Sequence, residues 1–553
     1  MKLLPTPKKS DLFFLPLGGT GEIGMNFNLY GHKGKWLIVD CGVTFRDENI
    51  PGAEIIMPDI VSLKGHEKNI SGILLTHAHE DHFGAVHYLW PYLKCPVYAT
   101  PFTAYLLKNR LSEFHLDQEV EIIEVSLSGS YQIGPFKIEL VNITHSILEP
   151  NAVVINTDIG KILHTGDWKI DETPVIGKLT NENRLKKLGD ENVLAMVCDS
   201  TNSIVEGNSG SESSIISGLK DSIFACKGRV FVTTFASNIG RVKTITDIAQ
   251  KAGRQVALLG RSMWKMTEAA RNVGYLKGYP PYLNEKQIKY IDPEKILIVC
   301  TGSQGEPRAG LFRLVSGKHP AVKLSSYDRV IFSSRIIPGN EKSIFSIINK
   351  LTDLGVEVIT PSDSNIHVSG HPAREELKKM YKWVKPKISI PVHGEARHLR
   401  AHADLAKDIG VSQVIEARNG TLVKLSQESS KIVETIYTGR LAYDGIDVLP
   451  IDSEIFKIRK KISLNGVVYV SLLIGRENKL FYKPVIHSLG VVSDVDGDFP
   501  EERIYSEVME ICENNIKNKN KNILTSLILK KIKNFFNVEY SKYPHVIVDL
   551  VEI

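Results

Sequence analysis

Cysteine is scarce in this 553-residue sequence, which has only six, scattered along the chain. No two of them form a Cys-x-x-Cys pair, which argues against a disulfide framework and against a thiolate zinc ribbon. No apolar run approaches the ~20 residues that a membrane-spanning helix needs, and residues 1–10 lack the apolar stretch of a secretory signal. These absences predict a cytoplasmic protein with no membrane contact and with reduced, mostly buried thiols.

The sequence also lacks a strong excess of positive or negative charge. The formal net charge is +5, and contents of 42% hydrophobic and 24% charged residues are those of an ordinary globular protein. So mild a charge permits a polyanionic ligand but does not require one. The length predicts two to four domains.

Histidine is concentrated at residues 75–84, with the sequence Leu-Thr-His-Ala-His-Glu-Asp-His-Phe-Gly, directly after an apolar run. Imidazole and carboxylate groups at such density suit a borderline-soft divalent ion such as zinc. If the apolar run is a strand, His77 and His79 lie on one side of a site at its end. Asp81 and His82 would open the next helix and serve a second metal. A solvated loop of scattered histidines is the alternative, but so dense a pattern seldom arises by chance.

This motif resembles the signature of the metallo-β-lactamase superfamily, which builds an αββα sandwich with one or two metals at the sheet edges. The resemblance implies further ligands from isolated positions after later strands, and the sequence offers His145, Asp167 and His393 in order. The first of two zinc ions would be held by His77, His79 and His145, the second by Asp81, His82 and His393, and both by Asp167. Manganese or magnesium could replace zinc, because ligand type alone does not fix the metal.

A long interval separates the last two implied ligands, Asp167 and His393. A simple superfamily hydrolase does not need it, and the insert resembles the β-CASP domain of members that process nucleic acids. Residues 197–202, 365–371 and 392–395 resemble the three motifs of that group. The resemblance makes His371 the general acid, with Asp199 orienting it or sharing its proton. A structural histidine in a Gly-His-Pro turn is the alternative for His371.

Four further stretches narrow the resemblance to the ribonuclease J family of bacteria, namely residues 14–26, 234–238, 300–307 and 333–340. It extends from about residue 10 to the C-terminus. It implies a metal-dependent ribonuclease with single-stranded RNA as partner, acting in RNA maturation and decay. Both 5′→3′ exonuclease activity on 5′-monophosphorylated RNA and endonuclease activity are implied, with 5′-phosphate and 3′-hydroxyl products.

The resemblance also implies a pocket for the 5′-phosphate, one nucleotide away from the metals and too small for a triphosphate. Hydroxyl, amide and backbone N–H groups at turns are good phosphate partners. The implied residues are Ser237, Asn238, His367, Val368, Ser369 and Gly370. Ordinary turn chemistry is the alternative for the two serines. This chain departs from the family pattern at Gly240, close to Ser237 in the sequence, where many family members carry a histidine.

The fold class expected from these resemblances is α/β: a metallo-β-lactamase αββα sandwich, an inserted β-CASP α/β domain and a small α+β C-terminal domain. The expected boundaries are 1–206 and 373–450 for the two parts of the sandwich, 207–372 for the insert and 455–553 for the C-terminal domain. Residues 19–24 match G-x-G-x-x-G, but a β-hairpin rather than a helix follows, so a tight turn at the rim of the metal site is expected. Strands and helices alternate in the insert, which predicts a parallel sheet covered by helices, including one over residues 239–252.

The C-terminal region contains apolar residues at helical spacing from Ile523 to Ile532, beside Lys530, Lys531 and Lys533. A solvated face explains such lysines better than RNA binding does. The small domain is expected to support oligomerisation, and the resemblance suggests a homodimer or a homotetramer. It also admits a structural calcium ion, which the sequence does not place, and leaves partners in RNA degradation unknown.

Three other functions fit parts of the sequence. A related β-CASP nuclease could act on DNA, but DNA-directed relatives usually carry valine where this chain has His393. A thioesterase or lactonase would not need the insert or the pair formed by Asp199 and His371. A non-catalytic RNA-binding scaffold would not need the full ligand set.

Overall fold

The computed structural model describes residues 4–45, 50–475, 479–492, 500–516 and 521–553. The chain divides into two compact units, one of residues 1–44 and 57–439 and the other of residues 45–56 and 440–553. None of the helices in the described ranges combines the length and apolar character that crossing a bilayer requires.

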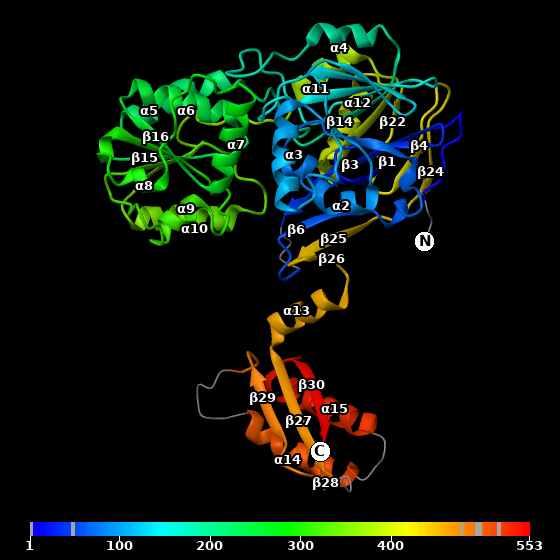
Figure 1. The fold of residues 1–553 in the computed structure, drawn as a ribbon, viewed down its shortest axis with the longest axis vertical. Helices are drawn as coiled ribbons and strands as arrows, with labels where there is room; N and C mark the ends of the chain where they lie inside the picture. The colour runs from blue at the N-terminus through cyan, green and yellow to red at the C-terminus, as the bar shows by residue number, and fades with distance from the viewer. Residues whose placement is uncertain (1–3, 46–49, 476–478, 493–499, 517–520) are drawn as a thin grey trace. The chain divides into compact units, whose positions relative to one another are not determined.

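Two mixed sheets form the centre of the larger unit (Figure 1). The first has the order β24 (Lys431–Thr435), β23 (Thr421–Lys424), β1 (Leu12–Gly18), β3 (Phe27–His32), β4 (Lys35–Val39), β7 (Ile70–Leu74), β8 (Val97–Ala99) and β9 (Ile122–Glu124). The second has the order β10 (Ser130–Ile133), β11 (Phe136–Asn142), β12 (Asn151–Asn156), β13 (Lys161–His164), β14 (Val193–Asp199), β20 (Ile388–Val392) and β22 (Gln413–Val414).

The two sheets pack against each other through one buried apolar cluster, to which Phe14 and Leu37 contribute from the first sheet and Val153 and Val197 from the second. Successive residues of a strand point to opposite faces, so Met196 lies on the outer face of the second sheet. Three helices cover that face: α4 (Glu182–Gly189), α11 (Arg374–Val384) and α12 (Ala396–Asp408). The first sheet is flanked by α3 (Pro101–Glu113), which contacts β8 and β9. These layers confirm the expected αββα sandwich.

Parallel strands make up the sheet of the inserted region, in the order β16 (Gln255–Leu259), β17 (Ile296–Cys300), β15 (Val230–Thr233), β18 (Arg329–Phe332) and β19 (Glu357–Ile359). Its helices are α5 (Ile216–Phe224), α6 (Ile239–Lys251), α7 (Arg261–Asn272), α8 (Glu285–Ile288), α9 (Gly310–Val315) and α10 (Glu341–Asp353). One apolar cluster joins the sheet to α5 and α6 and another joins it to α9 and α10, so both faces are covered. The predicted parallel sheet is confirmed.

The glycine-rich turn at residues 19–24 precedes a β-hairpin, because β3 pairs with β4 in antiparallel register. Within the turn, β2 (Thr20–Gly21) pairs with β21 (Gly394–Glu395). The backbone N–H of His393 donates to the carbonyl oxygen of Gly19 at 2.7 Å. The turn therefore lies beside an implied metal ligand, and the dinucleotide-binding interpretation is excluded.

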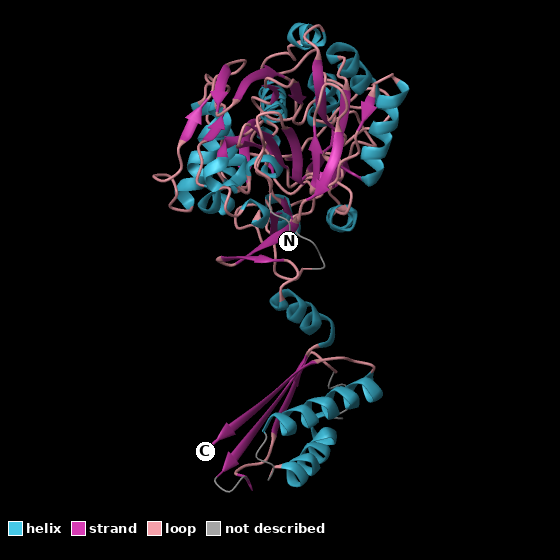
Figure 2. Ribbon diagram, turned by 90° about the vertical axis from the view of Figure 1, so that its right-hand side faces the viewer, coloured by secondary structure: helices cyan, strands magenta, loops and turns pink. Residues whose placement is uncertain are grey.

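Two further sheets are formed by strands within residues 44–59 and 439–450 and by strands within residues 467–552 (Figure 2). One has the order β26 (Asp447–Pro450), β25 (Gly439–Asp444), β6 (Ile55–Asp59) and β5 (Thr44–Phe45). In the other, β27 (Val467–Gly475) pairs with β28 (Lys479–Leu480), β29 (Val485–Leu489) and β30 (His545–Glu552). Two helices, α14 (Pro500–Asn515) and α15 (Lys521–Tyr540), share a core with this second sheet, and α13 (Glu454–Asn465) precedes it.

The predicted C-terminal helix is α15, which buries Leu524, Ile528 and Ile532. Lys530 and Lys533 are exposed, and Lys531 lies 3.2 Å from a carboxylate oxygen of Glu507. This is the solvated face that the sequence favoured. The domain boundaries expected from the sequence stay predictions.

A buried ion pair connects helix α6 to neighbouring segments of the inserted region. Arg241 of α6 is fully buried, and its Nε and Nη2 each donate to Glu212 at 3.0 Å. Its Nη1 donates to the carbonyl oxygens of Ser333 at 2.8 Å and Ile366 at 3.3 Å. Burial opposes the charged form of Glu212, but the guanidinium outweighs it and lowers the pKa of this carboxyl to about 2.

The change Arg241→Met should lower the free energy of unfolding by about 3–5 kcal/mol, because it leaves the Glu212 carboxylate buried without its partner. The double variant with Arg241→Met and Glu212→Gln should lose less of the free energy of unfolding. Because the pKa of Glu212 is depressed, the pair's contribution is complete above the ordinary value of 4.5 and is lost as pH falls towards about 2. Urea denaturation between pH 3 and pH 7 measures both effects. Equal losses of unfolding free energy in the single and double variants would contradict this role of the Arg241–Glu212 pair.

Candidate active site

The seven residues predicted as metal ligands lie at the ends of strands or in the first turn of a helix. His77 and His79 follow β7, while Asp81 and His82 lie in α1 (Glu80–Phe83). The remaining ligands, His145, Asp167 and His393, follow β11, β13 and β20. The structure brings them into two groups that share Asp167, one with His77, His79 and His145 and one with Asp81, His82 and His393. Within each group, one ligand atom from every residue lies within 4.8 Å of the others.

Three imidazole nitrogens of the first group converge. Nε2 of His77 lies 3.0 Å and Nε2 of His145 lies 3.1 Å from Nδ1 of His79. Around a tetrahedral zinc ion with Zn–N distances of about 2.0–2.1 Å, ligand nitrogens stand about 3.3 Å apart. Burial lowers the pKa of His77 well below its ordinary value and that of His79 to about 4, so both are neutral and able to bind a cation.

In two of these rings, the nitrogen that does not face the metal site contacts a residue of the inserted region. Nδ1 of His145 lies 2.6 Å from the carbonyl oxygen of Gly370, which only accepts hydrogen bonds, so His145 carries its proton on Nδ1. Nε2 of His79 lies 3.0 Å from the Ser237 hydroxyl. Both contacts leave the converging nitrogens free for a metal.

The second group is oriented in the same way. Nε2 of His82 lies 3.2 Å and Nε2 of His393 lies 3.5 Å from Oδ2 of Asp167. Nδ1 of His82 donates to Asp40 at 2.7 Å, and Nδ1 of His393 lies 3.0 Å from Oδ1 of Asn26. These contacts direct the Nδ1 proton of each ring away from Asp167.

Asp167 itself is almost completely buried, and its Oδ1 finds no hydrogen-bond partner among the described residues. Burial opposes its ionisation, but His393, His82 and His371 outweigh this and hold its pKa well below the ordinary value. A buried carboxylate with a free oxygen is costly unless a cation pairs with it. The donor set therefore fits divalent metal ions.

A further acid–base pair adjoins the metal ligands. Nδ1 of His371 lies 2.8 Å from Oδ2 of Asp199 and 3.8 Å from Oδ2 of Asp167. Oδ1 of Asp199 accepts from the backbone N–H and the hydroxyl of Thr201, both at 2.8 Å. Burial disfavours the imidazolium, but the carboxylates of Asp199 and Asp167 outweigh it and raise the pKa of His371 to about 9. His371 is therefore protonated at neutral pH and can donate a proton.

The residues predicted for the phosphate pocket fall into two sets. The loop of residues 367–370 leads directly to His371, and the N–H groups of Val368, Ser369 and Gly370 find no acceptor in the described parts of the chain. Free N–H groups in a loop can bind an anion. The Ser369 hydroxyl accepts from the side chain of Asn202 at 2.8 Å.

The other set is already engaged within the protein. Ser237 contacts His79, and Asn238 caps α6, where its Oδ1 accepts from the Arg241 N–H at 2.9 Å and its Nδ2 donates to Glu212 at 3.2 Å. Burial lowers the pKa of His367 to about 3, so this ring is neutral. Asn238 therefore serves as the N-cap of α6.

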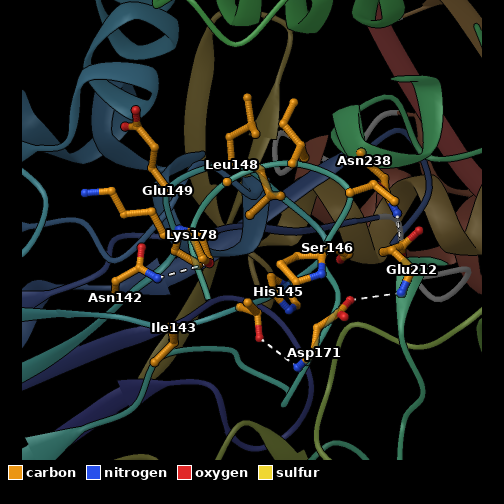
Figure 3. Close-up of a pocket in the computed structure, with 18 of the residues that line it drawn as sticks. Asn142, Ile143, His145, Ser146, Leu148, Glu149, Asp171, Lys178, Glu212 and Asn238 are labelled. Atoms are coloured by element: carbon orange, nitrogen blue, oxygen red, sulfur yellow. Dashed lines mark hydrogen bonds between the residues drawn. The ribbon is translucent and has the colours of Figure 1, made fainter. Parts of the chain in front are cut away.

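A small hollow, part of it open to solvent, lies against His145 (Figure 3). Ser146, Glu149 and Asp171 are among its lining residues. Gly240 also lines it, and an added Cβ there would lie 3.1 Å from Val175 and 3.2 Å from Ile176. In this chain, the loop that carries Val175 and Ile176 occupies the space into which a side chain at position 240 would point.

The sequence did not point to Asp40 or Asn202. Asp40 follows β4, has a φ of 66° and accepts from the Thr76 N–H at 2.8 Å as well as from His82. An acidic residue directly after an apolar strand was the available signal. Asn202 lies within the first β-CASP-like motif, but its contacts with Ser369 and His371 join distant parts of the chain.

The change Asp40→Asn should weaken metal binding about 10-fold to 100-fold although Asp40 binds no metal, because it loses the acceptor that orients His82. Zinc competition with a chelator measures the affinity, and circular dichroism checks the fold. The exposed Asp190 provides the matched control, Asp190→Asn, which should bind like the wild type. An unchanged zinc affinity in the Asp40 variant would refute the orienting role.

Four family models match the chain. They are the metallo-β-lactamase superfamily at residues 22–178, the β-CASP domain of ribonuclease J at residues 227–351, the RNA specificity domain of Zn-dependent metallo-hydrolases at residues 356–417 and the C-terminal domain of ribonuclease J at residues 455–553. A solved protein of unknown function from Enterococcus faecalis is similar in fold, with a TM-score of 0.53 and 16% identity, over 75% of this chain and 100% of that chain.

Curated relatives match over nearly the full length. The ribonuclease J of Sinorhizobium meliloti is 41% identical, over 98% of each chain. The ribonuclease J of Thermus thermophilus is 35% identical, over 91% of this chain and 88% of its own. With four matching domain models, full-length relatives and two ligand groups that share Asp167, the chain belongs to the ribonuclease J family.

Proposed function

We propose that this protein is a zinc-dependent ribonuclease that removes nucleotides stepwise from the 5′-monophosphorylated end of single-stranded RNA and also cleaves RNA internally. The observation that carries the proposal is the position of the His371–Asp199 pair, 3.8 Å from the carboxylate that both metal-ligand groups share. A proton donor beside two potential metal sites suits the hydrolysis of a phosphodiester.

Two zinc ions per chain are proposed, with manganese or magnesium as substitutes. When bound, such ions lower the pKa of water towards about 7 and neutralise charge on the scissile phosphate. The histidines of both groups, Asp81 and the shared Asp167 would hold them. The rings keep their orientation through Asp40, Asn26, Ser237 and Gly370.

His371 would protonate the leaving 3′-oxygen. Its Nδ1 proton is held by Asp199, so the second proton of the imidazolium, on Nε2, is the one available for transfer. Burial opposes the charged form of this ring, and the adjacent Asp199 carboxylate favours it. Donation to the 3′-oxygen yields a 3′-hydroxyl on one product and leaves the 5′-phosphate on the other.

The loop of residues 367–370 would receive the 5′-phosphate. Support comes from the free N–H groups of Val368, Ser369 and Gly370 and from their place in the chain directly before His371. We further propose that the enzyme is cytoplasmic, that it forms a homodimer or homotetramer, and that it acts in RNA maturation and decay.

End-labelled single-stranded RNA with a 5′-monophosphate, triphosphate or hydroxyl tests the proposal. The zinc-loaded enzyme should release mononucleotides mainly from the monophosphorylated RNA and leave DNA of the same sequence intact. His371→Ala should slow release by about 10²–10⁴-fold, because the leaving oxygen loses its proton donor. His115→Ala, at an exposed position, is the control and should act like the wild type.

Equal cleavage of DNA would contradict the proposed substrate. Internal fragments formed at equal rates from all three RNAs would support nuclease activity but contradict the assignment of the 5′-phosphate pocket. No cleavage of any RNA by the metal-loaded protein would overturn the proposal as a whole.

A further inference from the structure

Arg335 places a positive charge near the proposed active site. It lies in the loop after β18, is exposed to solvent, and its Nη1 donates to Oδ1 of Asn202 at 3.1 Å. No carboxylate in the described ranges of the chain forms an ion pair with this guanidinium. Most of its five N–H donors therefore remain available to an anion.

The loop that carries Arg335 is fixed by a neighbouring turn. Gln304, in the turn after β17, donates from Nε2 to the carbonyl oxygen of Arg335 at 2.8 Å. Its Oε1 accepts from the N–H of Ile337 at 2.9 Å. Because β17 and β18 are both parallel strands of one sheet, their turns meet at the edge where such sheets bind ligands.

Asn202 connects Arg335 to the loop that holds the proposed proton donor. Its Nδ2 donates to the Ser369 hydroxyl at 2.8 Å and to the carbonyl oxygen of His371 at 3.1 Å. The side chain of Asn202 thus lies between the guanidinium of Arg335 and both Ser369 and His371. The side chain of Asn202 is buried, so this bridge is held in place by its surroundings.

The chemistry of the proposed reaction determines which part of the RNA lies here. When an exonuclease removes the first nucleotide, the leaving atom is the 3′-oxygen of that nucleotide, and His371 protonates it. Groups around His371 therefore face the departing nucleotide rather than the remaining strand. The other phosphate of that nucleotide is its 5′-phosphate.

We propose that Arg335 binds the 5′-phosphate of the departing nucleotide and so contributes to selecting 5′-monophosphorylated RNA. The inference rests on the proposed function. The N–H groups of Val368, Ser369 and Gly370 supply neutral donors, whereas Arg335 supplies the charge and a planar fork of donors suited to phosphate. A terminal monophosphate carries more negative charge than an internucleotide phosphate, so a cation here favours the chain end.

The test compares kcat/KM on two RNAs of one sequence, with either a 5′-monophosphate or a 5′-hydroxyl. Arg335→Gln should reduce the ratio of the two values by about 10-fold to 100-fold, as expected for lost hydrogen bonds to a charged group. Arg335→Lys should restore part of the ratio, because it keeps the charge but loses the fork. Arg271→Gln is the matched control, since Arg271 donates to the carbonyls of Tyr279 and Pro280, and it should keep the wild-type ratio.

A binding measurement without turnover gives an independent readout. In calorimetry with the zinc-loaded protein, Arg335→Gln should raise the Kd of adenosine 5′-monophosphate about 10-fold to 100-fold, with a smaller effect on adenosine 3′-monophosphate. Zinc content and the circular dichroism spectrum of the variant verify that it is folded.

Two results would overturn the inference. An equal fall of kcat/KM on both RNAs would place Arg335 on internucleotide phosphates, and an unchanged ratio with unchanged nucleotide affinity would leave it without a role in binding. If the wild type itself shows no preference for the 5′-phosphate, the proposed end selection fails as well. That outcome is visible in the wild-type data alone and is distinct from a failure of Arg335.

Discussion

The buried carboxylate of Asp167 is the feature on which the rest of the site depends. It adjoins ligands from both histidine groups and the His371–Asp199 pair, and one of its oxygens has no hydrogen-bond partner among the residues described. A buried anion of this kind is costly unless cations or donors surround it. Imidazoles and His371 surround this carboxylate, and a bound divalent metal would meet the same requirement.

The inserted region contributes to the geometry of this centre. Its Ser237 hydroxyl contacts His79, and the carbonyl of Gly370 holds His145. An added Cβ at Gly370 would lie 2.5 Å from the Ser146 hydroxyl, so no larger residue fits there without displacement. The contacts that orient these two rings therefore also join the inserted region to the sandwich.

The family resemblance predicted the layers of the sandwich, whereas local sequence patterns predicted the parallel inserted sheet and the first ligand cluster. His77, His79, Asp81 and His82 lie on one strand–loop–helix segment, so a short motif reveals them. His145, Asp167 and His393 are isolated in the chain, and only the family resemblance indicated them. The contact between Asn26 and His393 joins residues 367 positions apart, and no spacing rule reaches that far. For the same reason Asp40 and Asn202 escaped prediction, and the capping role of Asn238 became visible only with Glu212 and Arg241 beside it.

The most direct test of the account is a crystal structure of the zinc-loaded protein with anomalous scattering data at the zinc absorption edge. Two peaks are expected, one on each side of Asp167, the first within bonding distance of His77, His79 and His145 and the second within bonding distance of Asp81, His82 and His393. Both peaks should be within reach of the Asp167 carboxylate. A single peak, or peaks at other residues while Asp167 stays unbound, would contradict the central claim that this carboxylate joins two metal ions.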